Sequence, residues 1–381
     1  MEIFFFLFNN VIMKKIGGGI LFTPEIDHII KIVFITFLFS VCIMPLMKRI
    51  AHHIGAIDVP RNTEHNRHIH KKPIPKLGGV GIFLAFLFGY MLFGQHSIKM
   101  NAILIGSFVI ILTGMMDDIN DLRASRKLIG QLIAAAIIVF YGKIVITDIS
   151  AFGLVFNFGI LSEILTMIFI VACINIINLT DGLDGLSGGV TSIFYITTGI
   201  ICFYQGRIGT LEFTLTFIML GATLGFLFHN FNPAKIFAGD CSQFMGFMIA
   251  VISLLGFKGT ALTSLFVPIL ILGLPILDTL FAIIRRTLKG QPIFSADKEH
   301  FHHQLLGMNF SQRTTVLIIY GINILFALTS VFYVLKDPRA ARVVYIILLI
   351  ILIWFVCYTS IITDKRPPKL KEIKRKLKSK K

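Results

Sequence analysis

The sequence has few charged residues and almost no tryptophan. Only 15% of its 381 residues are Asp, Glu, Lys or Arg, and a single Trp stands beside 37 Phe. A soluble protein of this length has about a quarter of its residues charged, with apolar residues spaced at amphipathic intervals. The low charge therefore excludes a soluble enzyme, and it equally excludes a disordered chain, which needs high polarity.

Cysteine is also scarce, and no two cysteines form a CxxC pair. The five are Cys42, Cys173, Cys202, Cys241 and Cys357. Most of them lie inside apolar runs, so we expect small buried hydrophobic side chains. A secreted scaffold held together by disulfides is excluded.

Apolar residues are what the chain has in abundance. They make up 55% of it, and one membrane span takes about 20 apolar residues. Apolar windows recur at about 27–47, 77–94, 101–116, 128–141, 160–178, 187–204, 211–228, 243–256, 261–284, 314–335 and 342–362. The sequence predicts an all-α polytopic membrane protein with about eleven transmembrane helices.

The basic residues predict an orientation. An odd number of helices puts the two termini on opposite sides, and cytoplasmic loops carry an excess of Lys and Arg. Loops on the side of the C-terminal tail hold 26 of the 36 basic residues, whereas the opposite loops hold seven. We therefore expect the N-terminus outside and the C-terminus inside. The predicted organisation is a leader without an assigned role (1–25), a transmembrane catalytic domain (26–363) and a basic cytoplasmic tail (364–381).

The acidic residues are rare, and they gather at one predicted membrane face. Asp117, Asp118 and Asp121 follow the third predicted helix, Asp181 and Asp184 follow the fifth, and Asp240 precedes the eighth. Asp297 and Glu299 lie next to His300, His302 and His303. Four distant segments thus bring carboxylates and imidazoles to the cytoplasmic face, which predicts a functional site there.

Clustered carboxylates suit a hard divalent cation, most simply Mg²⁺. Lys71, Lys72, Lys76 and the imidazoles could neutralise phosphate oxygens nearby. Metal, cations and a membrane interface together favour phosphoryl transfer between a lipid and a water-soluble phosphate partner. Glycines open the second and sixth predicted helices, and they indicate either close helix packing or phosphate contact at a helix N-terminus. They are Gly78, Gly79, Gly81, Gly185, Gly188 and Gly189.

Other interpretations were weighed for the same residues. Asp181 and Asp184 could instead cap the sixth helix, and the histidines could bind a structural zinc. Glu212 and the other acids of the opposite face are expected to be solvated helix ends. A secondary transporter would carry its acids at mid-helix and show internal repeats; neither feature is found here.

Five segments in order resemble the polyprenyl-phosphate N-acetylhexosamine-1-phosphate transferases, a glycosyltransferase 4 type family. They are PIPKLGGVGIF at 73–83, GMMDDINDL at 114–122, NIINLTDGLDGLSGG at 175–189, NFNPAKIFAGD at 230–240 and EHFHHQLL at 299–306. The chain looks like the WecA/TagO branch of this family. The branch that uses UDP-N-acetylmuramoyl-pentapeptide typically reads GTPTMGG, DDxxK and three consecutive histidines instead, and it is kept as the alternative.

The resemblance implies an activity and its partners. N-acetylhexosamine 1-phosphate, with GlcNAc the expected sugar, would pass from a UDP-N-acetylhexosamine to undecaprenyl phosphate, and UMP would leave. The product would initiate an O-antigen, common-antigen or teichoic-acid type polymer. The enzyme is expected in the bacterial inner membrane with its site facing the cytoplasm. Membrane lipid is a partner, homodimers are common in the family, and no nucleic acid is expected.

The family pattern also implies roles for individual residues. Asp240 matches the Mg²⁺ ligand, with Mn²⁺ as an alternative ion, and Asp117 matches the base or activator of the lipid phosphate, with Asp118 beside it. Further positions match the nucleotide or sugar site and the phosphate contacts. They are Asn178, Asp181 and Asp184 for the former, and Lys71, Lys72, His302 and His303 for the latter.

The chain departs from the branch pattern after Asp240. The branch usually reads Gly-Asp-x-Gly-Ser, whereas this chain reads GDCSQ with Ser242 and Gln243. Asp278 matches an aspartate of the branch, but the sequence assigns it no role.

Overall fold

A computed structural model describes residues 13–16, 19–59, 73–151, 154–256, 266–288, 290, 300–335 and 338–358. Within these ranges the chain is mainly helical, and its strands form three short antiparallel hairpins. The hairpins pair β1 (Met13–Ile16) with β2 (Gly19–Phe22), β3 (Ile57–Asp58) with β4 (Ile74–Pro75), and β5 (Asp148–Ala151) with β6 (Leu154–Asn157). The predicted all-α fold is confirmed.

Each of the eleven predicted windows overlaps a helix. In chain order these are α2 (Pro24–Ile54), α3 (Gly78–Phe93), α4 (Ile98–Asn120), α5 (Ala124–Ala136) with the π-helical turn η2 (Ile137–Tyr141), η3 (Gly159–Leu161) with α6 (Ser162–Thr180), α7 (Leu186–Tyr204), α8 (Leu211–Asn230), η4 (Gly239–Ser242) with α9 (Gln243–Gly256), α10 (Phe266–Ile271) with α11 (Gly273–Leu288), α13 (Gln312–Leu335) and α14 (Pro338–Tyr358). A short extra helix, α12 (Phe301–Gly307), carries the histidines. The predicted leader and tail lie mostly outside the described residues.

The outer surface of the helices is apolar enough to face lipid. Among the described residues, eight helical segments are long and apolar enough to cross a membrane, and α3 and part of α14 are shorter apolar helices. Large side chains such as Phe34, Phe108, Ile168 and Ile347 are about half exposed or more, which a soluble surface rarely tolerates over so wide an area. The predicted polytopic membrane fold is confirmed. The number of crossings and their orientation remain predictions.

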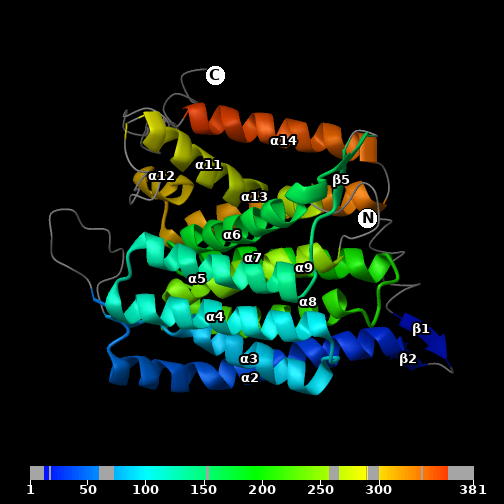
Figure 1. The fold of residues 1–381 in the computed structure, drawn as a ribbon, viewed down its shortest axis with the longest axis horizontal. Coiled ribbons are helices and arrows are strands. Elements are labelled where there is room, and N and C mark those ends of the chain that lie inside the picture. The colour runs from blue at the N-terminus through cyan, green and yellow to red at the C-terminus, as the bar shows by residue number, and fades with distance from the viewer. Residues whose placement is uncertain are drawn as a thin grey trace.

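The helices run side by side along the long axis of the molecule (Figure 1). In that view α2 and α14 lie at opposite edges of the bundle, and α9 lies between them. Helix α2 begins at the right end, near the β1–β2 hairpin, and α14 finishes at the left end, where α12 lies. We refer to the left end as the α12 end.

Small residues let α2 and α8 approach closely. Ser40 of α2 donates a hydrogen bond to the carbonyl of Ala222 at 2.8 Å, and Thr36 is fully buried. A Cβ added at Gly221 would collide with Thr36 and come within 2.6 Å of the Val33 carbonyl oxygen. Between transmembrane helices, close backbone packing of this kind replaces the hydrophobic drive that lipid does not supply.

Helix α9 forms the centre of the core. All of its residues are buried, and α4, α6 and α8 pack around it. Its first turn, η4, carries Asp240, so the most buried element of the fold also positions the residue expected to bind metal. Cys173, Cys202 and Cys241 are buried and form no disulfide, as the sequence predicts, whereas Cys42 on α2 is exposed, so the expectation of a buried side chain is wrong for it.

The expectation for Glu212 is wrong. Its side chain is largely buried rather than solvated, and Arg207 lies 3.2 Å from its carboxylate. Arg207 also donates a hydrogen bond to the carbonyl of Gly256, at the end of α9. The sequence does not reveal the contact between Arg207 and Gly256, because it joins positions 49 residues apart.

The close packing of α8 on α2 predicts that adding one methyl group at Gly221 destabilises the protein, whereas adding one at an open glycine does not. Gly221→Ala should destabilise the protein by about 1–3 kcal/mol, because the Val33 backbone cannot move aside without shifting α2. Thermal unfolding of the purified protein in detergent measures this. The matched control is Gly321→Ala on α13, where an added Cβ meets nothing within 4 Å, and there the stability should be unchanged or slightly higher. Equal stability of the two variants would contradict the packing argument.

Candidate active site

Two helix termini bring acidic residues together at one place, and a third adds a lysine. Asp117 and Asp118 lie in the last turn of α4, and Asp240 lies in the turn η4 that begins α9. The ammonium of Lys127, in the first turn of α5, forms an ion pair with Asp117 and lies 3.4 Å from Oδ1 of Asp240. Two carboxylates therefore face one cation. This confirms that the segments at 117 and 240 meet, as the sequence predicts.

Asp118 fixes the backbone of the neighbouring segment. Its two carboxylate oxygens both lie 3.0 Å from the backbone nitrogen of Asp240, which donates the hydrogen bond. Gly239 has a φ of +68°, and a Cβ there would lie 2.5 Å from Oδ2 of Asp118, so only glycine fits this turn. Asp118 is mostly buried and acts on Asp240 through the backbone, while Asp117 faces the cation directly.

Local contacts explain why α4 ends where it does. Asp121 is the C-cap residue in the left-handed conformation, and its backbone N–H donates to the carbonyl of Asp117. The Asp117 carboxylate in turn accepts the backbone N–H of Leu122 at 2.8 Å. Gly114 lies so close to η4 that a Cβ would come within 2.9 Å of the Asp240 carbonyl. The segment that begins at Gly114 thus combines a close contact, a helix cap and the carboxylates of Asp117 and Asp118.

Asn178 touches the same carboxylate from α6. Its Nδ2 lies 3.5 Å from Oδ1 of Asp240, and its Oδ1 accepts the hydroxyl of Ser242 at 2.8 Å. Because the hydroxyl occupies the amide oxygen, the amide nitrogen is left facing Asp240. Gln243 accepts a hydrogen bond at 2.9 Å from Gln131, one helix away. The sequence GDCSQ, which differs from the family pattern, therefore still keeps Asp240 in place through contacts with neighbouring segments.

The two aspartates of the DGLDG loop have different partners. Asp181 accepts the hydroxyl of Ser187, and burial raises its pKa to about 7. Asp184 accepts hydrogen bonds from the Asn232 side chain at 2.9 Å and from the backbone of Ala234 at 3.0 Å. Neither carboxylate caps α7, whose N-cap Gly185 has no side-chain cap. The capping interpretation is therefore wrong.

Glycines that open α3 serve packing. The backbone N–H groups of Gly78 and Gly79 donate to the carbonyls of Phe237 and Ala238 at 2.8 and 3.1 Å. A Cβ at Gly79 would lie within 2.6 Å of the Cys241 backbone. Since these donors are already occupied, the packing interpretation holds and the phosphate interpretation does not. The PIPKLGG segment joins the NFNPAKIFAGD segment to α3.

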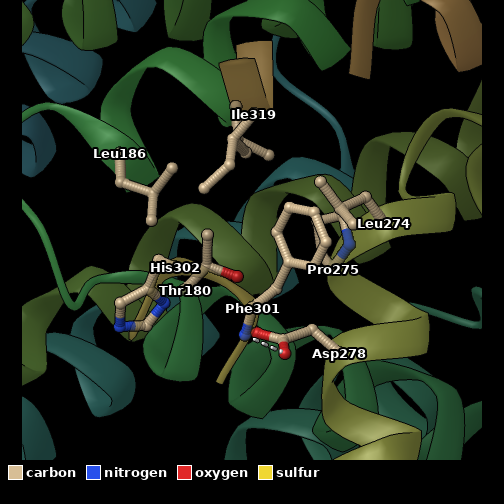
Figure 2. Close-up of a pocket in the computed structure, with 9 residues that line it drawn as sticks. Thr180, Leu186, Leu274, Pro275, Asp278, Phe301, His302 and Ile319 are labelled. Carbon is tan, nitrogen blue, oxygen red and sulfur yellow. Dashed lines mark hydrogen bonds between the residues drawn. The ribbon is translucent and has the colours of Figure 1, made fainter. Parts of the chain in front are cut away.

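Asp278, which the sequence left without a role, holds the histidine helix in place. Its carboxylate accepts the backbone N–H of Phe301 at 2.8 Å (Figure 2). It also lies 3.1 Å from Nδ1 of His300. Helix α12 is thereby attached to α11 at its first residue. The ring of His302 follows, with its centroid 4.2 Å from that of His303.

His302 points at the DGLDG loop. A Cβ added at Gly182 would lie 2.6 Å from His302 Nε2, and that nitrogen is buried with no hydrogen-bond partner within the described part of the chain. Burial lowers the pKa of His302 to about 3, so the imidazole is neutral at physiological pH. A cavity of about 20 Å³ adjoins it, which has room for about one water molecule. Figure 2 shows Thr180 and Asp278 among its walls.

The structure adds residues that the sequence did not single out, and four of the predicted candidates, among them Asp297 and Glu299, lie outside the described residues. Lys127 is the main addition. The sequence analysis treated it only as a basic loop residue, although only one short loop separates it from the helix that carries Asp117. Ser187 and Ser242 gave no signal of their own. Lys71 and Lys72 lie outside the described residues.

The acidic residues of the site suit a metal ion that takes most of its ligands from elsewhere. No group of three or more His, Cys, Asp or Glu side chains in the described ranges is arranged to hold an ion by itself. Asp117 and Asp240 nevertheless converge on the Lys127 ammonium, which shows that a cation fits between them. Mg²⁺ commonly binds through one or two carboxylates and takes the rest of its shell from water and substrate phosphates.

Comparison with known proteins identifies the family. Residues 100–257 match the model of glycosyl transferase family 4. The chain is 40% identical over 361 residues to a probable undecaprenyl-phosphate N-acetylglucosaminyl 1-phosphate transferase of Bacillus subtilis, covering 92% of this chain and 99% of that protein.

Two further relatives bear related names. A decaprenyl-phosphate N-acetylglucosaminephosphotransferase of Mycobacterium tuberculosis is 33% identical, over 77% of this chain and 80% of its own length. An undecaprenyl-phosphate alpha-N-acetylglucosaminyl 1-phosphate transferase of Escherichia coli is 26% identical, over 74% and 78%. With its acidic helix termini, its histidine helix and these relatives, the chain belongs to glycosyl transferase family 4.

Proposed function

We propose that this protein transfers N-acetylglucosamine 1-phosphate from UDP-N-acetylglucosamine to undecaprenyl phosphate. The observation that carries the proposal is the placement of Asp117 and Asp240 around the single ammonium of Lys127, at one end of a membrane-spanning bundle. Carboxylates that share a cation at such a place suit a diphosphate donor and a lipid-borne acceptor. The names of the relatives supply the sugar phosphate and the polyprenyl phosphate.

The proposed reaction is a direct displacement. An oxygen of the acceptor phosphate attacks the sugar-bearing phosphorus of the donor, a new P–O bond forms, and the bond to the UMP oxygen breaks. Asp117 takes any proton that the acceptor phosphate still carries. We prefer this route to a covalent aspartyl intermediate because it needs fewer steps. Lys127 balances the charge of the reacting phosphates from its position between Asp117 and Asp240.

Mg²⁺, with Mn²⁺ as the alternative, fits this donor set. Asp240 would bind the ion, because its backbone is fixed by Asp118 and its carboxylate is contacted by Asn178. When bound, the ion would neutralise charge on the diphosphate oxygens. His302 offers a neutral imidazole with an unpaired nitrogen, which suits hydrogen bonding to a phosphate oxygen together with His303.

The DGLDG loop is proposed to receive the nucleotide sugar. Asp181 is partly buried, and its backbone N–H donates to the carbonyl of Asn178 at 3.2 Å. There its carboxylate can accept a hydrogen bond from a sugar or base. Asp184 is proposed to act indirectly, because its carboxylate holds the 232–234 loop near the start of α7. We therefore assign Asp181 to ligand contact and Asp184 to support of the loop.

The enzyme is proposed to lie in the bacterial inner membrane with this site at the cytoplasmic face. Helix α14 finishes at the α12 end (Figure 1), and ten Lys and Arg follow within residues 365–381. A basic segment of this kind favours the cytoplasm, which is also where a water-soluble UDP-sugar is available. The product would then initiate a cell-envelope polysaccharide.

Release of UMP by the purified protein in detergent tests the proposal. With Mg²⁺ and undecaprenyl phosphate, we expect release from UDP-GlcNAc and little from UDP-GalNAc or UDP-MurNAc-pentapeptide. Omission of the lipid is the control and should abolish release. Release with the pentapeptide substrate would instead assign the protein to peptidoglycan synthesis, and no release from any donor would refute the transferase proposal.

Asp240→Asn should abolish Mg²⁺-dependent turnover while the protein still folds. The substitution keeps the shape of the side chain and the backbone N–H that Asp118 binds, but it removes the metal-binding charge. The measurement is UMP release over a series of Mg²⁺ concentrations, with thermal unfolding as the check on folding. Asp121→Asn is the matched control, since Asp121 is exposed and Asn tolerates its left-handed backbone. Native turnover in Asp240→Asn would remove Asp240 from the metal site.

Lys127→Gln should lower kcat by about 10²–10³, the range found when one charge-stabilising donor is removed. Without the ammonium, Asp117 and Asp240 face each other unpaired, so the KM for Mg²⁺ should fall or stay unchanged while turnover is lost. Steady-state kinetics separate the two effects. Lys99→Gln, at the other end of α4, should behave as the native protein. A kcat equal to that of the control would show that Lys127 is a structural residue only.

A further inference from the structure

Three amide side chains from different helices meet inside the bundle, next to the candidate active site. They are Gln131 of α5, Asn175 of α6 and Gln243 of α9, and we refer to them as the amide triad. Gln131 donates a hydrogen bond from Nε2 to Oε1 of Gln243 at 2.9 Å, and its own Oε1 accepts from Nδ2 of Asn175 at 2.7 Å. Gln131 therefore joins the other two residues through both ends of one amide group.

The amide triad lies where polar side chains are costly. Gln131 and Gln243 are 2% and 0% exposed, and they belong to helices of a membrane-spanning bundle. Burial of an amide costs free energy unless it finds a hydrogen-bond partner, and lipid supplies none. Asn175 is also held by its own helix, because its Nδ2 donates to the carbonyl of Val171 at 2.8 Å. The proposed reaction gives none of the three amides a role.

The amide triad repeats the arrangement of the site one helical turn deeper in the bundle. In the site, Lys127 and Asn178 both contact Oδ1 of Asp240, at 3.4 and 3.5 Å. Each of these three residues is three or four positions from one member of the amide triad, so the two side chains of each pair lie on the same face of their helix. The pairs are Lys127 and Gln131 on α5, Asn178 and Asn175 on α6, and Asp240 and Gln243 at the start of α9.

This stacking connects the two layers mechanically. A rotation or shift of one helix that separates the amides also moves the site residue on the same face of that helix. Hydrogen bonds depend steeply on distance and angle, whereas apolar side chains can slide past one another at little cost. A single buried Asn fixes the register of helices in a coiled coil for the same reason. The amide triad thus favours one register of α5, α6 and α9.

The departure from the branch pattern after Asp240 makes these contacts. Gln243 stands where the branch pattern has Ser, and a Ser hydroxyl ends well short of the position of a Gln amide. The contact with Gln131 is therefore not part of that pattern. The neighbouring Ser242, which stands where the pattern has Gly, donates to Oδ1 of Asn178 at 2.8 Å. One of the two altered residues holds α6 in the site layer, and the other holds α5 in the layer beneath.

We propose that the amide triad is a positioning device, which sets the register of α5, α6 and α9 so that Lys127 and Asn178 meet Asp240. The inference rests on the proposed function, because it explains how the residues assigned to that reaction are held. Amides suit this task because they are directional and carry no charge. They hold the helices without competing for a metal ion and without adding to the repulsion between the carboxylates of the site.

Steady-state kinetics of Gln243→Met test the proposal. The substitution keeps the length of the side chain and removes the acceptor of the Gln131 hydrogen bond. It should lower kcat by about 10–100-fold, as loss of a residue that orients a functional group does, and change the KM for UDP-GlcNAc little. Asn323→Leu on α13 is the matched control, since Asn323 is 1% exposed and donates to the carbonyl of Ile319 on its own helix at 2.9 Å. Equal kcat values in the two variants would overturn the proposal.

A double variant shows whether the amide triad acts through the site. In Lys127→Gln the ion contacts that the triad is proposed to align are already lost. Adding Gln243→Met to Lys127→Gln should therefore lower kcat much less than the same substitution does in the native protein. The same fold loss in both backgrounds would show that Gln243 affects the rate independently of Lys127, and this would overturn the positioning role.

Thermal unfolding in detergent separates positioning from general stability. Gln131→Met and Gln243→Met each leave a buried amide without its partner and should lower the unfolding midpoint. The double Met variant replaces both amides by apolar side chains of similar length, so its midpoint should return toward the native value while its kcat stays low. Strictly additive losses of stability, or recovery of kcat together with the midpoint, would overturn the proposal. Coupled stability in a native protein that releases no UMP would reject the proposed reaction alone.

Discussion

The carboxylate of Asp118 accepts the backbone N–H of Asp240, and the whole site depends on this contact between segments 122 residues apart. It forms only because Gly114 lets α4 approach the turn η4 and because Gly239 leaves room for the carboxylate. Once Asp240 is fixed, its side chain meets Lys127 and Asn178. The buried carboxylate of Asp118 thus determines where Asp240 lies.

Charge balance follows from the same arrangement. Two carboxylates that face each other at the end of a bundle repel unless a cation lies between them. Lys127 supplies that cation from α5, so the protein can fold with the cluster intact before any ligand binds. Under the proposed function, a metal and a diphosphate would meet carboxylates that are already placed, and little rearrangement would be needed. The histidine helix is placed in a comparable way by Asp278, whose acceptor oxygens define where α12 begins.

The sequence predicted that distant acidic residues meet. The lengths of the helices and their alternating directions are enough to place particular helix ends on the same side of the bundle. Asp117, Asp181 and Asp240 needed only that argument. The same argument could not identify Lys127, because a basic residue near a loop is first interpreted as a sign of membrane orientation. Its contact with two carboxylates depends on the direction in which α5 follows α4. Asp184 and Asp278 gave a similar difficulty: an aspartate that holds a loop or a helix start has the same sequence appearance as one that meets a ligand. The packing role of Gly78 and Gly79 became clear only when their N–H partners were known.

The complete burial of α9 has a consequence for how the enzyme responds to its membrane. Of the apolar window formed by η4 and α9, 89% is buried inside the protein, against 22% for the window in α2 and 33% for the window in η3 and α6. A change in bilayer thickness acts on the helices that touch lipid, through tilt and local bending. Helix α9 touches none, and its first turn carries Asp240. Asp240 is therefore insulated from hydrophobic mismatch, and the outer helices take up the adjustment when the lipid composition of the membrane changes.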